Sequence, residues 1–180
     1  MFKQNNIIKL NTLNNFNINL KSIITKKLTK NEIRAICLLK DEEWTYGIRS
    51  QLDWFKNNIQ SCDKHNLLFI NSKLVGYAAL RRKVYSFKNF KKKNFYLLLD
   101  ALIVDKKYRK LKLSELLMFM NNLTIKKTGI ISFLLCNNKL VKFYKMHGWK
   151  KINRKFVSVI NSKLHLNGMV FNGKNKKNVF

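Results

Sequence analysis

The sequence is poor in several residues that would direct it toward particular classes of protein. It has no proline, three cysteines and nine acidic residues among 180. The cysteines, Cys37, Cys62 and Cys136, are odd in number and far apart, which fits neither a disulfide framework nor the close pairs that bind zinc. We therefore expect no metal site and a reducing compartment.

Long apolar runs are also missing. No run approaches the roughly 20 residues that cross a bilayer, and the start, MFKQNNIIKL, lacks the long apolar core of a signal peptide. These absences predict a soluble, cytoplasmic protein. Hydrophobic residues still make up 46% of the chain, so its composition is not that of a disordered protein.

Positive charge is what the chain has in excess. Its 37 Lys and Arg residues give a formal net charge of +28, which is typical of proteins that bind nucleic acid, an anionic membrane or a polyanionic ligand. Lysine and asparagine crowd every segment that looks exposed, so we attribute part of the charge to coding bias and favour a generally solvated basic surface over a nucleic-acid footprint. The resulting field would still attract an anionic ligand.

Hydrophobic periodicity predicts, in order, a strand, two helices, three strands, a helix, a strand, a helix and two strands. The predicted ranges are Ser22–Lys26, a helix starting at the capping box Thr29–Glu32, Trp44–Ile59, Leu67–Ile70, Leu74–Leu80 after the turn Asn71-Ser72, Phe95–Val104, Ser114–Lys127, Gly129–Cys136, Lys139–His147, Trp149–Ile160 and Leu164–Phe171.

This order describes a single α/β domain, with a mixed, twisted central sheet of about six to seven strands flanked by about four helices. We expect residues 21–171 to form it. Residues 1–20 would be an N-terminal arm or an extra strand, and residues 172–180 a basic tail. The strand Phe95–Val104 is nearly continuous in its hydrophobicity, so we expect it to be buried on both faces.

The segment DALIVDKKYRKLKLSELLM, from Asp100 to Met118, runs from that strand through a basic turn into a helix. Backbone N–H groups at a helix N-terminus attract phosphates, so this arrangement suits a pyrophosphate. Here the chain resembles the GNAT superfamily of N-acyltransferases, whose signature is a strand ending in Val, an aromatic-Arg pair, and Arg-x-x-Gly-x-Gly/Ala opening a helix. Val104 and Tyr108-Arg109 agree, but Lys112 and Ser114 replace the small residues.

A second segment strengthens the resemblance. The family's other signature places Tyr seven residues after Asn, followed four and five residues later by Gly and an aromatic residue. Asn137, Tyr144, Gly148 and Trp149 fit it in order and spacing. The two signatures and the predicted elements extend the resemblance over residues 21–171, and imply the GNAT fold for that range.

The resemblance implies a cofactor site and a reaction, in which acetyl-CoA or another acyl-CoA is the acyl donor. Backbone groups of Leu102, Ile103 and Val104 would pair with the pantetheine arm. Tyr144 would donate a proton or hydrogen bond to the departing thiolate, after direct attack of an amine on the thioester. The other cofactor-binding residues so implied are Arg109, Lys110, Leu111, Lys112, Leu113, Ser114 and Asn137.

The general base is harder to find, because eight of the nine acidic residues lie in segments that look exposed or capping. Asp100 interrupts the apolar run LLLDALIV, where an unpaired charge is costly, so it is partnered, protonated or next to water. Several family members place a proposed base at this point of the strand. The alternative is a structural carboxylate bonded to backbone or to Arg81.

Three aromatic or imidazole side chains each allow two interpretations. Tyr144 can also be read as a core aromatic residue, and His147 as a cation at a helix end. Trp44, beside the cluster Asp41-Glu42-Glu43, is a candidate for lining the acceptor site, or for packing a helix on the sheet.

The function implied by the resemblance also has a competitor. A basic GNAT-like module that has lost catalysis and binds nucleic acid or a ribosome would account for the positive charge and for the missing glycines. The sequence identifies neither the small-molecule or peptide amine acceptor, nor the acyl length, nor the oligomeric state.

Overall fold

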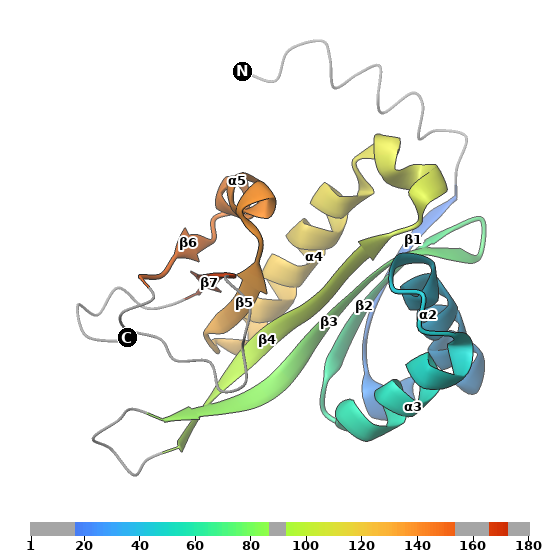
Figure 1. Ribbon diagram of the computed structural model, residues 1–180, viewed down its shortest axis with the longest axis horizontal. Helices are drawn as coiled ribbons and strands as arrows, with labels where there is room; N and C mark the ends of the chain where they lie inside the picture. Colours follow the sequence, from blue (N-terminus) through green and yellow to red (C-terminus); the bar gives the residue numbers. More distant parts are fainter. Residues whose placement is uncertain (1–16, 87–92, 154–165, 173–180) are drawn as a thin grey trace. The chain divides into compact units, whose positions relative to one another are not determined.

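The computed structural model describes residues 17–86, 93–153 and 166–172. Its elements follow the predicted order, with two short 3-10 helices added (Figure 1). They are β1 (Ile18–Ile24), η1 (Thr25–Lys27), α2 (Lys30–Glu43), α3 (Ile48–Asn58), β2 (Lys64–Ile70), β3 (Lys73–Ser86), β4 (Lys93–Val104), η2 (Lys106–Leu111), α4 (Leu113–Thr128), β5 (Ser132–Cys136), α5 (Asn138–Met146), β6 (Lys150–Lys151) and β7 (Asn167–Phe171).

The seven strands form a mixed sheet in the order β1-β2-β3-β4-β5-β7-β6. Strands β1 and β2 are antiparallel, β4 and β5 are parallel, and β7 pairs antiparallel with both β5 and β6. The predicted mixed α/β fold with four main helices is therefore confirmed. No helix in the described part of the chain is long and apolar enough to span a bilayer.

The chain divides into two units. Unit 1 comprises Met1–Ala79 and Ala101–Leu117, and unit 2 comprises Leu80–Asp100 and Met118–Phe180. Elements β3, β4 and α4 each contribute residues to both. Each unit is described by its own contacts below.

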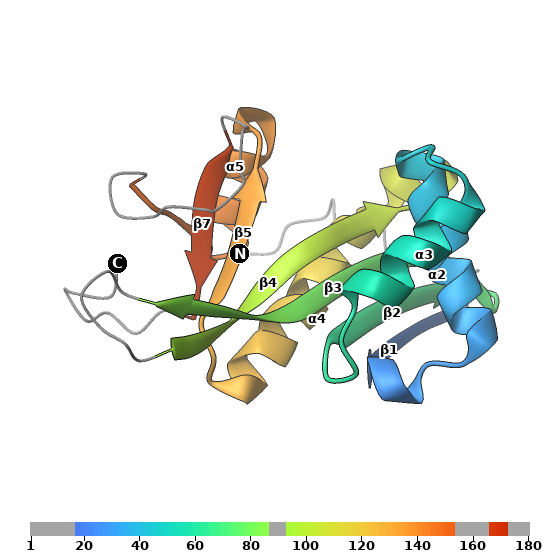
Figure 2. The same cartoon turned by 60° about the horizontal axis from the view of Figure 1, so that its bottom comes forward.

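Unit 1 has an apolar core on each face of its strands. Helices α2 and α3 cover one face (Figure 2), where Ile36, Phe55 and Leu67 belong to the same buried cluster. The first turn of α4 packs on the other, where Leu117 lies against Gly76. A Cβ on Gly76 would lie 2.9 Å from the Leu117 side chain, so the absence of a side chain on β3 permits this close packing.

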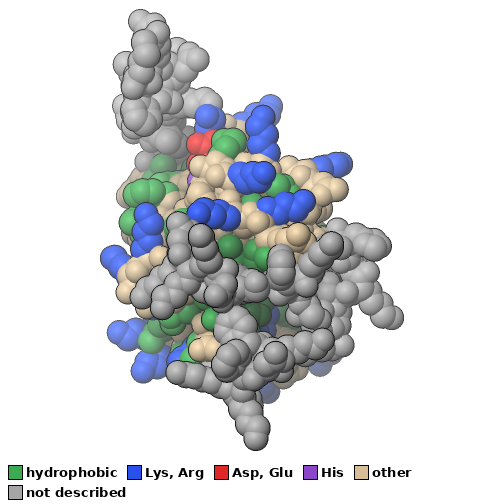
Figure 3. Space-filling model, turned by 90° about the vertical axis from the view of Figure 1, so that its left-hand side faces the viewer, with side chains coloured by type: hydrophobic (Ala, Val, Ile, Leu, Met, Phe, Trp, Pro, Cys, Tyr) green, Lys and Arg blue, Asp and Glu red, His purple; other side chains and the backbone are tan. Residues whose placement is uncertain are grey.

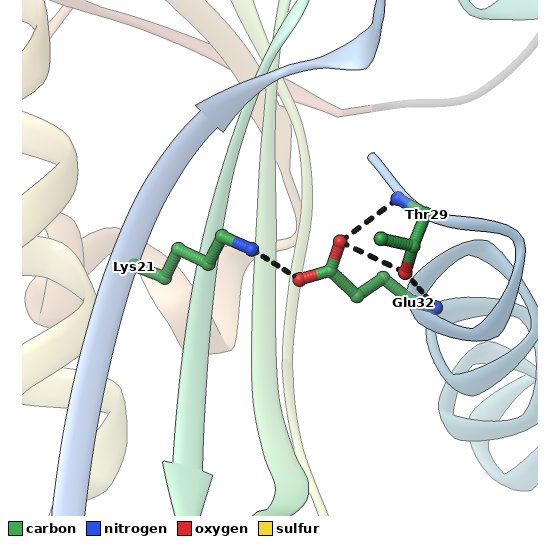
Figure 4. Close-up of polar contacts among 3 residues, drawn as sticks. All are labelled: Lys21, Thr29 and Glu32. Carbon is green, nitrogen blue, oxygen red and sulfur yellow. Dashed lines mark hydrogen bonds and ion pairs between the residues drawn. The ribbon is translucent and has the colours of Figure 1, made fainter. Parts of the chain in front are cut away.

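The start of α2 shows how local sequence fixes a boundary. The Thr29 hydroxyl accepts from the Glu32 backbone N–H at 3.1 Å, and the Glu32 carboxylate accepts from the Thr29 N–H at 2.9 Å. Lys21 of β1 also donates to Glu32 (Figure 4). The predicted capping box is confirmed, and it satisfies backbone donors that a helix N-terminus leaves without partners.

The predicted tight hairpin is confirmed as well. Asn71 and Ser72 alone connect β2 to β3, and both have positive φ, 49° and 65°. This is the conformation that two-residue hairpin turns require, because it matches the twist of the flanking strands.

Several predicted boundaries were wrong. Strand β1 runs from Ile18 to Ile24 rather than from Ser22 to Lys26, so its first three residues lie in the segment expected to be an arm or an extra strand. Strand β5 begins at Ser132 rather than at Gly129. Helix α3 begins at Ile48 rather than Trp44, because Trp44 caps the end of α2 and Gly47 turns the chain with a φ of 83°. The Gly47 N–H donates to Asp41 at 2.7 Å, which stabilises that turn.

Burial along β4 and α4 also differs from expectation. One face of β4 is buried from Leu97 onward, whereas Leu98 and Leu102 on the other face are half-buried, and Phe95 near the start of the strand is exposed. On α4, helical spacing predicts that Leu116, Leu117, Met120 and Leu123 face inward. Leu117 is buried, but Leu123 is exposed, whereas polar Asn121 and Thr124 are buried. Hydrophobic periodicity alone therefore placed Leu123 wrongly.

The last two strands are only partly comparable with the prediction. The structure gives β6 two residues and β7 five, shorter than predicted. The predicted turn at residues 161–163, much of both predicted strands and the basic tail from residue 173 lie outside the described residues.

Candidate functional site

The turn between β4 and α4 begins at Asp105, directly after the last residue of the strand. Its backbone N–H donates to Val75 at 2.8 Å, and its carboxylate accepts from the Lys107 N–H at 2.9 Å and from the Lys73 ammonium at 2.8 Å. Asp105 thereby caps η2 and ties its start to β3.

Asp105 was expected in a segment that looks exposed or capping; it caps η2, but it is buried, with 3% of its surface exposed. Asp63 is also buried, and its carboxylate accepts from the Gln60 N–H at 2.8 Å. Burial alone would raise the pKa of Asp105, but hydrogen bonds from Lys73 and the Lys107 N–H, with the attraction of both lysines, hold the pKa below its usual value. An aspartate directly after a strand and before a helical turn is the signal that could have identified it.

Arg109 also stabilises this turn. Its Nε donates to the Val104 carbonyl oxygen at 3.2 Å, and its guanidinium forms an ion pair with Glu43 at the end of α2. The predicted cofactor ligand is thus a structural link between β4, η2 and α2. The acidic cluster near Trp44 has structural contacts in turn, because Glu43 pairs with Arg109 and Asp41 holds Gly47.

Lys112 completes the turn with a left-handed backbone, φ 54° and ψ 27°. This conformation is strained for residues with a Cβ, which explains why the resemblance places glycine here. Leu113 is buried and Leu111 is half-buried in the adjoining core. The turn presents the exposed residues Lys110 and Lys112 to solvent.

The left-handed backbone gives a stability prediction. Lys112→Gly should raise the free energy of unfolding by about 1 kcal/mol, because glycine adopts positive φ without the Cβ penalty. For a chain of this size the melting temperature should rise by roughly 2–4 °C in calorimetry. Lys110→Gly is the matched control, because Lys110 has no positive φ, and it should not stabilise the protein. Equal effects of the two changes would contradict the prediction.

Asn137 is the N-cap of α5. Its side-chain oxygen accepts from the Leu140 N–H at 3.2 Å, so the asparagine of the second signature has a structural use that the sequence did not reveal. His147 is the C-cap of the same helix, in agreement with the interpretation of His147 as a helix-end residue.

Tyr144 lies buried on the inner side of α5, with its ring edge-on to Phe143 and Trp149 at centroid distances of 5.2 and 6.1 Å. Burial, together with the nearby Cys136 thiol, raises the pKa of Tyr144 from 10.0 to about 12. The phenol is therefore protonated at neutral pH and can act as a hydrogen-bond or proton donor.

Asp100 forms an ion pair with Arg81 across the paired strands β4 and β3, at 2.9 Å. The Arg81 side chain is 8% exposed and that of Asp100 is 27% exposed. This contact is the structural role that the sequence left open for Asp100, and it explains how a carboxylate is accommodated in an apolar strand.

The residues of the predicted site fall in both units. Unit 1 brings together the end of β4, the turn and the start of α4, with Leu102, Ile103, Val104 and residues 109–114. Asp100, Asn137 and Tyr144 belong to unit 2. Sequence reasoning did not find Lys73, Glu43 and Asp105, which form the ion pairs that hold the turn.

Solved structures share this fold. Escherichia coli ElaA has a TM-score of 0.61 and 16% identity, covering 86% of this chain and 99% of its own. An acyl-CoA N-acyltransferase from Pseudomonas aeruginosa has a TM-score of 0.63 and 13% identity, with coverages of 86% and 99%. The aminoglycoside N-acetyltransferase AAC(6')-Iy, solved in complex with CoA, has a TM-score of 0.61 and 10% identity, with coverages of 83% and 97%.

No curated protein sequence matches the chain. The model of the acetyltransferase (GNAT) domain, however, matches residues 24–159, which is most of the chain and contains both signatures. The chain therefore belongs to the GNAT acetyltransferase family.

Proposed function

We propose that the protein is an acyl-CoA-dependent N-acyltransferase, most simply an N-acetyltransferase, that transfers an acyl group directly to an amine. The observation that carries the proposal is the strand-turn-helix from Leu102 to Ser114, whose turn is fixed from within by Asp105 and Arg109. A fixed turn at the N-terminus of a 16-residue helix offers backbone N–H groups to a phosphate.

In this proposal, the turn from Arg109 to Ser114 holds the pyrophosphate of acyl-CoA, and Lys110 and Lys112 add positive charge beside it. Strand β4 pairs with β5 at Leu97 and Leu98, and in this proposal the backbone of Leu102, Ile103 and Val104 further along β4 pairs with the pantetheine arm. Asn137 contributes by capping α5, the helix that carries Tyr144. Ser114 replaces a smaller residue of the signature at the first turn of α4.

In the proposed reaction, one bond forms and one bond breaks at the thioester carbonyl carbon. The acceptor amine, after losing a proton to a base or to water, forms the new C–N bond while the C–S bond breaks. Tyr144 donates its phenolic proton to the departing thiolate and regains one from solvent. Its raised pKa keeps that proton in place at neutral pH until negative charge develops on sulfur.

Thiol release tests the function directly. The protein, incubated with acetyl-CoA and longer acyl-CoAs against a library of small amines and peptides, should liberate free thiol in proportion to an acylated product detected by mass spectrometry. Release that requires no amine would indicate hydrolysis instead. Acyl-CoA binding without turnover of any amine would support the competing function, a catalytically degenerate binding module.

Charge reversal at the turn should weaken acyl-CoA binding. In Lys110→Glu/Lys112→Glu the dissociation constant, measured by calorimetry, should rise about 10- to 100-fold, because two phosphate partners are replaced by repelling charges. Lys26→Glu/Lys27→Glu in η1 is the matched control, since it makes the same change in net charge at exposed residues of the same unit. An equal loss of acyl-CoA affinity in both double variants would contradict the proposal that this turn binds the phosphates.

The Arg81 ion pair favours a structural role for Asp100 over that of general base, and Asp100→Asn distinguishes the two. We expect the variant to lose about 1–2 kcal/mol of stability, since nearly buried Arg81 would lose its charged partner. The acidic limb of its pH-rate profile should remain. Arg81→Met should lower the melting temperature similarly by breaking the same pair. If the acidic limb disappears with most of the rate in Asp100→Asn alone, Asp100 is the base.

A further inference from the structure

The net positive charge of the chain is larger in one unit. Unit 2 contains 20 Lys and Arg residues and a single acidic residue, Asp100, whereas unit 1 contains 17 and eight. The numbers of basic residues are similar, so the difference in net charge arises from the near absence of acidic residues in unit 2, which a coding bias toward lysine does not explain. The turn proposed to bind phosphates lies in unit 1, and coenzyme A therefore does not account for the charge of unit 2 either.

Within unit 2, the paired segments of β3 and β4 present two different faces, since alternate residues of a strand point to opposite sides. On one face, Tyr85 and Tyr96 are half-buried and edge-on at 6.1 Å, and Tyr96 is edge-on to Phe133 of β5 at the same distance. These ring contacts fix the strand pair to the sheet from that side.

The opposite face carries exposed hydrophobic side chains among the described residues. Phe95 is 47% exposed and Val84 is 51% exposed. The exposed Arg82 has its guanidinium carbon 3.7 Å from the centre of the Phe95 ring. On the side of the molecule drawn in Figure 3, the coloured side chains include many basic and hydrophobic ones and few acidic ones.

We propose that this strand face, defined by Arg82, Val84 and Phe95, binds single-stranded nucleic acid. Exposed aromatic rings stack with unpaired bases, guanidinium groups stack or pair with phosphates, and a surrounding basic field follows the backbone. The aromatic-basic combination that does not stand out in the sequence is formed here by residues from two strands. The surface acts in addition to the proposed acyl transfer and does not depend on it.

The aromatic component distinguishes a single strand from other polyanions. A duplex keeps its bases stacked inside and offers mainly phosphates to such a face, and heparin or an anionic membrane has no bases to stack on Phe95. Selectivity for single strands and dependence on the Phe95 ring are therefore joint consequences of the proposal.

Fluorescence anisotropy of the full chain tests it, with labelled 12-nucleotide RNA and DNA single strands and a duplex of matched sequence, at salt concentrations from about 50 to 200 mM. We expect single strands to bind more tightly than the duplex, with RNA and DNA compared to identify the preferred sugar. Phe95→Ala and Phe95→Leu should each weaken single-strand binding about 5- to 100-fold, and Arg82→Ala about 5-fold or more.

Phe119→Ala is the matched control, because Phe119 is a 60% exposed aromatic residue of the same unit on α4, and it should leave the affinity unchanged. Circular dichroism and thiol release should be unchanged in the Phe95 variants, so that failure of acyl transfer and failure of nucleic-acid binding are separable. Equal affinity for single strands, duplex and heparin would overturn the proposal. So would equal single-strand affinity of the wild type and Phe95→Ala, or a Phe95→Ala variant that binds anionic vesicles more weakly but single strands as tightly as the wild type.

Discussion

Replacing Tyr144 with phenylalanine should lower the turnover number about 100-fold or more while changing acyl-CoA affinity only slightly. General acid catalysis typically contributes factors of about 10² to 10⁴. The phenol acts as charge develops on sulfur, so its removal should affect kcat rather than ground-state binding. Because the pKa of Tyr144 is about 12, the wild-type enzyme should also not lose activity through ionisation of this residue below about pH 10.

Tyr96→Phe is the matched control for this prediction. Tyr96 is a half-buried tyrosine of the same unit whose pKa is also raised, chiefly by burial, but no catalytic role is proposed for it. Stopped-flow or steady-state thiol release should show wild-type turnover in Tyr96→Phe and strong loss in Tyr144→Phe. Wild-type turnover in both would exclude Tyr144 as the acid.

The second large effect concerns the stability of unit 1 in mild acid. His65 is fully buried between the Thr25 hydroxyl, 2.8 Å from Nε2, and the Tyr77 hydroxyl, 2.9 Å from Nδ1. Burial lowers the pKa of His65 from 6.5 to about 4, although the charge of Asp63 partly opposes this.

The sign of the effect follows from proton binding. Below pH 6.5 the unfolded chain takes up a proton at this histidine, and the folded protein does not until about pH 4. Neutral His65 thus contributes about 3 kcal/mol to the free energy of unfolding. This contribution is fully present above pH 6.5 and is lost as the pH falls toward 4. The lowered pKa of Asp105 acts at lower pH, since its stabilisation is lost below the usual value of 3.8.

Urea unfolding between pH 7.5 and 4.5 measures this directly. The wild type should lose stability steeply across that range, and His65→Gln, which keeps hydrogen-bonding capacity but does not titrate, should show a much flatter profile even if it is less stable at pH 7.5. Parallel profiles of the two proteins would show that another group causes the acid sensitivity.

The sequence predicted those elements whose causes are local. Thr29 and Glu32 form a capping box within four residues, and Asn71-Ser72 form a turn within two, so neighbouring side chains suffice to fix them. The order of elements followed from hydrophobic spacing along the chain, and the family followed from the resemblance of two segments to its signatures. For the candidate site, the turn after Val104 was correctly found as a turn between strand and helix.

What the sequence did not reveal depends on residues far apart in the chain. The burial of Asp105 requires Lys73, 32 residues earlier, and the position of Arg109 requires Glu43, 66 residues earlier. On α4, Leu123 was placed wrongly, since it is exposed while polar Asn121 and Thr124 are buried. The uneven distribution of charge became visible only when the chain was divided into its two packed units.

The ion pairs that hold the turn after β4 also bear on how such a signature can change in evolution. Since Asp105, Lys73 and Arg109 set the path of the backbone, the shape of the turn does not depend on glycine at Lys112 or Ser114. Substitutions at those two positions alter local strain and surface charge but leave the backbone donors in place. A lineage can therefore lose the signature glycines gradually, and family members of this kind would be overlooked when only the glycine pattern is sought.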